Sequence, residues 1–142
     1  MRSRRLILVI LGLPLILLSI SAPYAYAFVT GEAASLVIGQ TGFTTSTLGT
    51  TSTTLYYPLA VAFDVRGDLW VVDDANNRVL MYRPPFRIGE AASLVIGQTG
   101  FTTSTRGTTS TTLYYPAAVA FDVRGDLWVA DEANNRVLMY RP

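Results

Sequence analysis

The sequence predicts an all-β protein built from two copies of one small antiparallel unit. Residues 31–84 realign on residues 89–142 with a constant offset of 58 positions (89 − 31), and the two copies differ at only four positions. Each copy contains short apolar stretches that are separated by turns containing Gly, Asn or Pro. A repeat of a few tens of residues is typical of folds in which each unit buries its apolar faces against its neighbours. The differing positions pair Leu48 with Arg106, Leu59 with Ala117, Val72 with Ala130 and Asp74 with Glu132.

Three apolar stretches in the first copy have the length and composition of β-strands. They cover residues 58–65, 69–73 and 78–83. Tight turns separate them, and Gly67 and Asn77 are suited to the left-handed backbone of such turns. A fourth stretch, residues 92–97, follows after Pro84, Pro85 and Phe86. Four short antiparallel strands per copy make up one blade of a β-propeller.

The strands are apolar on both faces, as the run Leu69-Trp70-Val71-Val72 shows. A sheet with one face in water would alternate apolar and polar residues. A blade that lies between two other blades buries both faces, so we expect Trp70 and Trp128 to be core residues. A two-layer β-sandwich of the same strands is the alternative, but it gives no reason for two nearly identical copies.

The strands and turns together resemble the NHL repeat of β-propeller proteins. The resemblance rests on Pro58 and Val61-Ala62-Phe63-Asp64, on residues 67–73, and on residues 76–80, and it recurs from Pro116 to Leu138. The preceding segment, residues 34–40, resembles the strand that often precedes this repeat in secreted prokaryotic members. The resemblance implies a propeller of several blades, commonly six. One departure is that Ala60 and Ala118 stand where the family usually has Gly.

The first 27 residues have the three-part layout of a secretory signal peptide. Arg2, Arg4 and Arg5 precede an apolar run over residues 6–20, and Ala25-Tyr26-Ala27 forms a cleavage signature. We expect cleavage after Ala27 and a secreted or extracytoplasmic chain of residues 28–142. The alternative is an uncleaved membrane anchor, for which the apolar run is shorter than the roughly 20 residues that cross a bilayer.

The composition excludes several classes of function. The sequence contains no His, Lys or Cys, so ordinary zinc sites, Ser–His and Cys–His nucleophiles and Lys Schiff bases have no residues to form them. Residues 28–142 carry eight Arg against ten acidic residues, a balance that does not favour nucleic acid. We therefore predict a non-catalytic binding or assembly module without a cofactor. A propeller-type lyase or lactonase is the alternative, although no active site for one is evident.

Candidate ligand-binding residues lie in two loops of each copy that emerge on the same face of a blade. One loop is a Thr-rich segment, residues 41–55, that ends in a Tyr pair, and the other is the turn after the second strand. Loops on a rigid scaffold often bind ligands, and paired Tyr residues beside small hydroxyl residues are typical of recognition surfaces. The candidates are Tyr56, Tyr57, Asp74, Asn76, Tyr114, Tyr115, Glu132 and Asn134. The alternative is that the Tyr pairs pack beneath the loops and that the Thr tract is a solvated linker.

Other charged motifs have simpler interpretations. The acidic pairs at Asp73 and Asp131 supply too few oxygens for Ca²⁺, which needs six to eight. We expect Asp73 to cap the following turn, and we expect Arg78 and Arg136 to pair with acidic groups of neighbouring blades. The tripeptide Arg66-Gly67-Asp68 spells an adhesion motif, but Gly and Asp are also the residues that a hairpin turn requires.

Two blades are too few to close a ring, which leaves two interpretations of the whole. The sequence runs from a fourth-type strand at residues 34–40 to a third-type strand at residues 136–141. It can be part of a longer propeller. It can also be a two-bladed chain that self-associates, in which case three copies close a six-bladed ring and each N-terminal strand completes a neighbour's last blade.

Overall fold

The protein is described by a computed structural model over residues 27–142, and nearly all of the predicted signal peptide lies outside these residues. Residues 33–142 form one compact unit. Residues 27–32 belong to a separate N-terminal unit, in which the Val29 N–H donates to the Glu32 carboxylate at 3.1 Å. In the part of the chain that is described, no helix is long and apolar enough to span a membrane.

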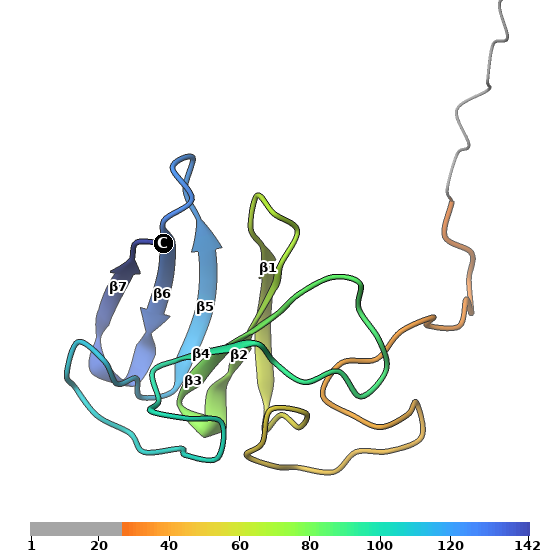
Figure 1. Cartoon of the computed structure of the whole chain (residues 1–142), viewed down its shortest axis with the longest axis horizontal. Coiled ribbons are helices and arrows are strands. Elements are labelled where there is room, and N and C mark those ends of the chain that lie inside the picture. Colours follow the sequence, from red (N-terminus) through yellow and green to blue (C-terminus); the bar gives the residue numbers. More distant parts are fainter. Residues whose placement is uncertain (1–26) are drawn as a thin grey trace, which may run out of the picture. The chain divides into compact units, whose positions relative to one another are not determined.

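The compact unit contains two antiparallel sheets that lie side by side (Figure 1). The first sheet has the strand order β1-β2-β3-β4 and the second has the order β5-β6-β7. The strands are β1 (Pro58–Phe63), β2 (Leu69–Asp73), β3 (Arg78–Tyr82), β4 (Leu94–Ile96), β5 (Pro116–Phe121), β6 (Leu127–Asp131) and β7 (Arg136–Tyr140). Short 3-10 helices, η1 (Asp74–Asn76) and η2 (Glu132–Asn134), connect β2 to β3 and β6 to β7. The predicted all-β fold and its four-stranded blade are confirmed.

The β1–β2 hairpin forms around the carboxylate of Asp64. Its Oδ1 accepts the backbone N–H groups of Arg66 and Asp68 at 2.8 and 3.0 Å, and its Oδ2 accepts the Trp70 indole N–H at 3.2 Å. Gly67 takes the left-handed conformation at φ 80°, where a side chain would be strained. Asp68 is buried beside Arg66, so the adhesion-like tripeptide is used within the turn.

The inner strands of the first sheet, β2 and β3, are buried on both faces, as the sequence predicted, whereas β1 is largely exposed. On one face Trp70, Val72, Val79 and Met81 pack against Leu113, Leu127 and Val129 of the second copy. On the opposite face Val71, Leu80 and Tyr82 form a second cluster with Leu55 and Ala92, and Ile38, Phe86 and Phe101 pack against it. Burial on both faces is what a propeller blade requires, because each blade lies between two others.

Two expectations about the second copy and the N-terminal segment are wrong in this structure. Residues 34–40 form no strand, although residues 94–96, which have the same sequence as residues 36–38, pair with β3 as β4. A strand needs an antiparallel edge to pair with, and residues 27–33, the described residues that precede this segment, contain no strand. Trp128 is 41% exposed whereas its counterpart Trp70 is 7% exposed. Within residues 27–142 no other sheet packs against the outer face of the second sheet.

Candidate binding groove

A groove of about 650 Å³ opens where the loops of the two copies meet. Its walls come from the residues that lead into β1 and β5 and from the turns η1 and η2. The lining residues are Tyr56, Tyr57, Leu59, Asp74, Ala75, Tyr115, Glu132, Ala133 and Asn135. The fold therefore brings loops that are 58 residues apart in sequence to the same end of the two sheets.

The groove contains most of the candidate residues that the sequence singled out. Tyr56, Tyr57, Asp74, Tyr115 and Glu132 line it, whereas Tyr114, Asn76 and Asn134 do not. Sequence reasoning missed Leu59, Ala75, Ala133 and Asn135, which have no charge or motif to mark them apart from their position next to the candidates.

Tyr57 and Tyr115 have an unusual backbone conformation. Their φ angles are 57° and 49°, in the left-handed region that bulky residues rarely adopt. Hydrogen bonds hold the first of these loops, because the Asp74 and Ala75 N–H groups donate to the Tyr57 and Tyr56 carbonyls at 3.3 and 3.1 Å. The rings of Tyr56 and Tyr57 lie 4.7 Å apart between centroids. Strained residues held in this way are often found at binding sites.

The buried carboxylate of Asp73 holds the loops that line the groove in place through hydrogen bonds. Its Oδ1 accepts the Tyr56 N–H at 2.6 Å, and its Oδ2 accepts Asn76 Nδ2 at 2.9 Å and Arg78 Nε at 2.7 Å. Asp73 therefore does not cap the turn that follows it, because its oxygens are taken by these three donors. The expectation that Arg78 pairs between blades is also wrong, since its carboxylate partner is in its own copy. Asp131 and Arg136 repeat the pair at 2.7 Å.

Asn76 and the Thr-rich loop form a hydrogen-bonded structure. Asn76 is 1% exposed; its Nδ2 also donates to the Gly49 carbonyl at 2.8 Å, and its Oδ1 accepts the Thr50 hydroxyl at 2.7 Å. Arg78 Nη2 donates to the Thr51 and Thr54 carbonyls at 2.9 and 3.1 Å. In the second copy Asn134 binds the Gly107 carbonyl in the same way, at 2.8 Å. The structure therefore places Asn76 and Asn134 in positions where they fix the loop, and the Thr tract is not a free linker.

The groove is acidic and has no basic residue in its lining. Burial raises the pKa of Asp74 above its ordinary value, and the charges of Glu132 and Asp73 raise it further. The carboxylates thus repel one another at neutral pH. Over residues 27–142 no group of three or more His, Cys, Asp or Glu side chains is arranged to hold a metal ion.

One of the differing positions affects Tyr114. The Arg106 guanidinium lies 5.3 Å from the centroid of the Tyr114 ring, and its Nη1 donates to the Tyr114 hydroxyl at 3.3 Å. Leu48 stands at the corresponding position of the first copy and is 55% exposed. The two copies therefore present different chemistry beside their first Tyr residues.

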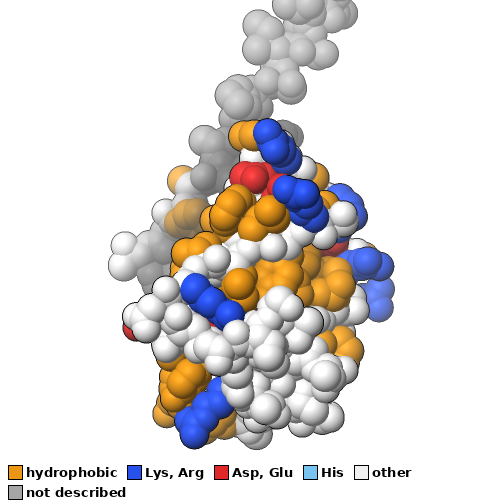
Figure 2. All heavy atoms as spheres, turned by 90° about the vertical axis from the view of Figure 1, so that its left-hand side faces the viewer, with side chains coloured by type: hydrophobic (Ala, Val, Ile, Leu, Met, Phe, Trp, Pro, Cys, Tyr) orange, Lys and Arg blue, Asp and Glu red, His pale blue; other side chains and the backbone are white. Residues whose placement is uncertain are grey.

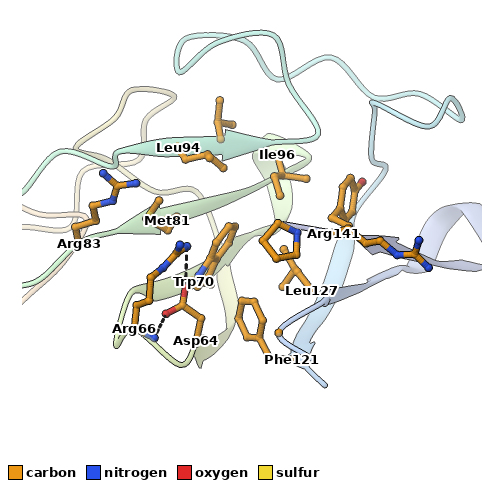
Figure 3. A pocket seen from close by; sticks show the side chains of 14 residues that line it. Asp64, Arg66, Trp70, Met81, Arg83, Leu94, Ile96, Phe121, Leu127 and Arg141 are labelled. Carbon is orange, nitrogen blue, oxygen red and sulfur yellow. Dashed lines mark hydrogen bonds and ion pairs between the residues drawn. The ribbon is translucent and has the colours of Figure 1, made fainter. Parts of the chain in front are cut away.

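A second cavity of about 350 Å³ lies between the sheets, near the hairpin tips (Figure 3). Trp70, Phe121, Leu127 and Ile96 surround it, and exposed Arg66, Arg83 and Arg141 stand around it. The Tyr140 hydroxyl is buried there without a partner, but the Tyr82 hydroxyl is also unpaired and does not line the cavity. An unpaired Tyr hydroxyl is thus common to both copies and does not by itself indicate a ligand.

The electrostatics of this second cavity come from the hairpin carboxylate of Asp64. Burial acts to raise the pKa of Asp64, but hydrogen bonds from Asp68, Trp70 and Arg66 and the charge of Arg66 outweigh it. The pKa of Asp64 is therefore below its usual value. A carboxylate already held by these donors serves the hairpin rather than a ligand.

Comparison with known families agrees with the architecture. The model of the NHL repeat matches residues 113–140, which include β5, β6, η2 and β7. No curated protein matches the chain significantly. The matched segment has the first three strands of a blade and the turn between the second and third, and the first copy has the same strands at the same spacing. Residues 113–140 of the chain are an NHL repeat.

Proposed function

We propose that this β-propeller-type chain is a non-catalytic binding module that acts outside the cytoplasm, and that its groove binds a cationic group. The observation that carries the proposal is the lining of the groove. Three Tyr residues and two carboxylates, Asp74 and Glu132, face the same space without a basic residue among them.

Charge supports a cationic ligand. The raised pKa of Asp74 reflects partial burial and repulsion from neighbouring carboxylates, and a bound cation would relieve that repulsion. Tyr ring faces also attract ammonium and guanidinium groups. A basic side chain of a peptide offers both the charge and an apolar stem that suits Leu59, Ala75 and Ala133.

The rigidity of the loops supports recognition. The buried network of Asp73, Asn76 and Arg78 fixes both loops before any ligand arrives. A site whose shape is already formed loses little conformational entropy on binding. The exposed rings of Tyr57 and Tyr115 are therefore presented on a fixed frame.

A non-catalytic role accords with the residue types in the chain. The sequence has no His, Cys or Lys to act as nucleophile, base or metal ligand. No specific observation in the groove favours the lyase or lactonase alternative. The extracytoplasmic location rests on the signal-like sequence of residues 1–27.

Calorimetric titration of the full chain with triarginine and with triglutamate tests the groove. We expect binding of triarginine that weakens with salt, and none of triglutamate. The double substitution Asp74→Asn and Glu132→Gln should reduce triarginine binding at least tenfold. Glu90→Gln, which removes one acidic charge away from the groove, is the control for general attraction. Equal loss in the control, or equal binding of both peptides, would contradict the proposed site.

A further inference from the structure

We propose that a second copy of this chain docks head to tail on the first. In this arrangement the outer face of the β5-β6-β7 sheet covers the open face of the first sheet in the next copy. Residues 36–38 of that next copy pair with β7 as the missing fourth strand. The interface between the two sheets of one chain is the template for this contact.

The internal interface shows what the outer face of a blade contacts. One face of the first sheet, with Trp70, Val79 and Met81, packs on the second copy's Leu113, Leu127 and Val129. The ring of Trp70 meets the ring of Phe121 edge to face, with 5.6 Å between centroids. Of the four positions that differ between the copies, only Val72 belongs to this buried cluster, and its counterpart Ala130 is also apolar.

The outer face of the second sheet carries the same residues uncovered. Trp128 is 41% exposed and Val137 61% exposed, whereas their counterparts Trp70 and Val79 are 7% and 0% exposed. Met139 is likewise exposed where Met81 is buried. Figure 2 views the molecule from the side that carries the second sheet and shows hydrophobic side chains gathered on it with Arg side chains around them. An apolar face of this kind is typical of an interaction surface.

The exposed β1 part of the first sheet, on the face away from the second sheet, is the complementary surface. Val61 and Phe63 are more than half exposed, whereas their counterparts Val119 and Phe121 are half-buried against the first sheet. The β1 residues Val61 and Phe63 are therefore available to contact another chain, whereas Leu55 and Val71, the counterparts of Leu113 and Val129, are already buried within their own chain. Because the two surfaces differ from each other, the contact is head to tail.

The N-terminal segment already lies where a fourth strand of a preceding blade belongs. Ile38 packs against the first sheet as Ile96, its counterpart in β4, packs against the second sheet. Gly39 and Gly97 lie equally close to Leu55 and Leu113, since a Cβ on either Gly would be 2.5 or 2.6 Å from the Leu Cδ1. The segment thus occupies its blade position without the strand that would pair with it.

The pairing of β3 with β4 fixes the register of the docked segment. Val79 pairs with Ile96, Leu80 with Val95 and Met81 with Leu94. The corresponding pairs between chains are Val137 with Ile38, Leu138 with Val37 and Met139 with Leu36. Within the described chain the outer edge of β7 and residues 36–38 have no strand partner.

The first copy makes a set of polar contacts with the second copy through Asn77, and the corresponding residue of the second copy, Asn135, lacks these contacts. Asn77 Nδ2 donates to the Ser104 carbonyl at 3.0 Å, and Asn77 Oδ1 accepts the Tyr115 N–H at 3.0 Å. Gln98 Nε2 also donates to the Asn77 carbonyl, at 2.9 Å. Asn135, the counterpart of Asn77, is exposed, and its side chain makes no hydrogen bond within residues 27–142. Ser46, Tyr57 and Gln40 of a docked copy would supply its partners.

Arg78 and Arg136 differ in the same way as Asn77 and Asn135. Arg78 Nη1 donates to the Phe101 carbonyl of the next copy, whereas Arg136 Nη1 turns to Thr108 of its own loop. Phe43, the counterpart of Phe101, is 54% exposed. Docking would offer Arg136 the Phe43 carbonyl of the neighbouring chain. A repeated head-to-tail contact closes into a ring or grows into a filament, and three copies supply the blades of a six-bladed ring.

Disulfide trapping tests the register directly, because the natural sequence contains no Cys. Full chains carrying Val37→Cys and full chains carrying Leu138→Cys are mixed and oxidised. Paired residues of antiparallel strands lie within disulfide reach, so we expect a covalent dimer in the mixture and little in either variant alone. Leu80→Cys with Val95→Cys in one chain is the positive control. Val37→Cys mixed with Val137→Cys places the thiols on opposite faces and should not react.

A charge on the docking face tests assembly without relying on Cys chemistry. Light scattering after gel filtration should give a multiple of the chain mass, with three chains for a closed ring. Val137→Glu should shift the chain to monomer, whereas Val123→Glu, at a fully exposed hairpin position, should not. A monomeric unmodified chain would overturn the proposal and assign both faces to a different occupant, such as further blades. Equal trapping in and out of register would also overturn it.

Discussion

Arg78 Nε lies 2.7 Å from Asp73 Oδ2, and both side chains are completely buried. The copy of this pair, Arg136 with Asp131, has the same distance, but the Arg136 side chain is 26% exposed. One sequence thus places the same ion pair in two environments within one chain. The difference arises because the loop of the second copy, through the Phe101 carbonyl, covers Arg78, whereas within residues 27–142 Arg136 donates only to its own loop and to Asp131.

Arg78→Met should destabilise the fold more than Arg136→Met does. Removing one partner of a buried ion pair leaves an uncompensated charge and typically costs about 3–5 kcal/mol. Arg136 has water nearby, so its loss should cost less. Urea unfolding measures both variants in the Val137→Glu background, in which docking is blocked. Equal losses would show that the cover over Arg78 contributes nothing.

Substitution of the two Trp residues should likewise reduce stability by different amounts. Truncating a buried aromatic side chain typically costs about 3–5 kcal/mol, so Trp70→Ala should lower the melting temperature sharply. Trp128→Ala should have a much smaller effect in the same monomeric background. Fluorescence of the Trp70→Phe variant, which leaves Trp128 alone, should be red-shifted relative to that of Trp128→Phe. Matching spectra would contradict the difference in burial.

Asp74→Asn should stabilise the folded chain at neutral pH. The folded-state pKa of Asp74 is raised, so its contribution is fully present below the ordinary value near 3.8 and is lost as pH rises through the higher folded value. The melting temperature of the variant should exceed that of the parent at pH 7 and match it near pH 3. Glu90→Gln is the charge control. A variant less stable at pH 7 would show that the Asp74 charge is satisfied.

The exported chain should begin at Phe28. A basic start, a short apolar run and Ala25-Tyr26-Ala27 predict cleavage after Ala27. Intact-mass measurement of the protein recovered from the medium or periplasm of a secreting host checks this. A mass that retains residues 1–27 would contradict it.

The repeat made the strands predictable, and the turns followed from Gly67 and Asn77, which both adopt positive φ. The joining of Tyr56 and Tyr57 with Asp74 in one groove followed from the order of loops in a blade. The ion-pair partner of Arg78 could not be predicted from the sequence. Asp73 lies directly opposite Arg78 across β2 and β3, and this pairing depends on a strand register that the sequence does not give. The exposure of Trp128 could not be predicted either, because burial of a face depends on what covers it rather than on its own residues.

The carboxylates of the acidic groove have opposite effects on the stability of the free chain and on the proposed binding of a cation. The charges that we propose attract a cation are those that repel one another in the free chain, as the raised pKa of Asp74 shows. Variants selected only for thermal stability would therefore tend to lose Asp74 or Glu132. A loss of stability at a binding site is a common cost of function.

Residues 36–38 and 94–96 have the same sequence, so the side chains of β3 cannot distinguish between the two segments as strand partners. Only the connection decides between them: about 11 residues separate β3 from β4, and about 39 separate it from the N-terminal segment. The loop-length dependence of closure entropy favours the shorter connection by only about 1 kcal/mol. A nascent chain therefore faces a competition between correct pairing and a swapped one, and the contacts that Phe86 and Ala92 make beyond the strand itself must help to resolve it.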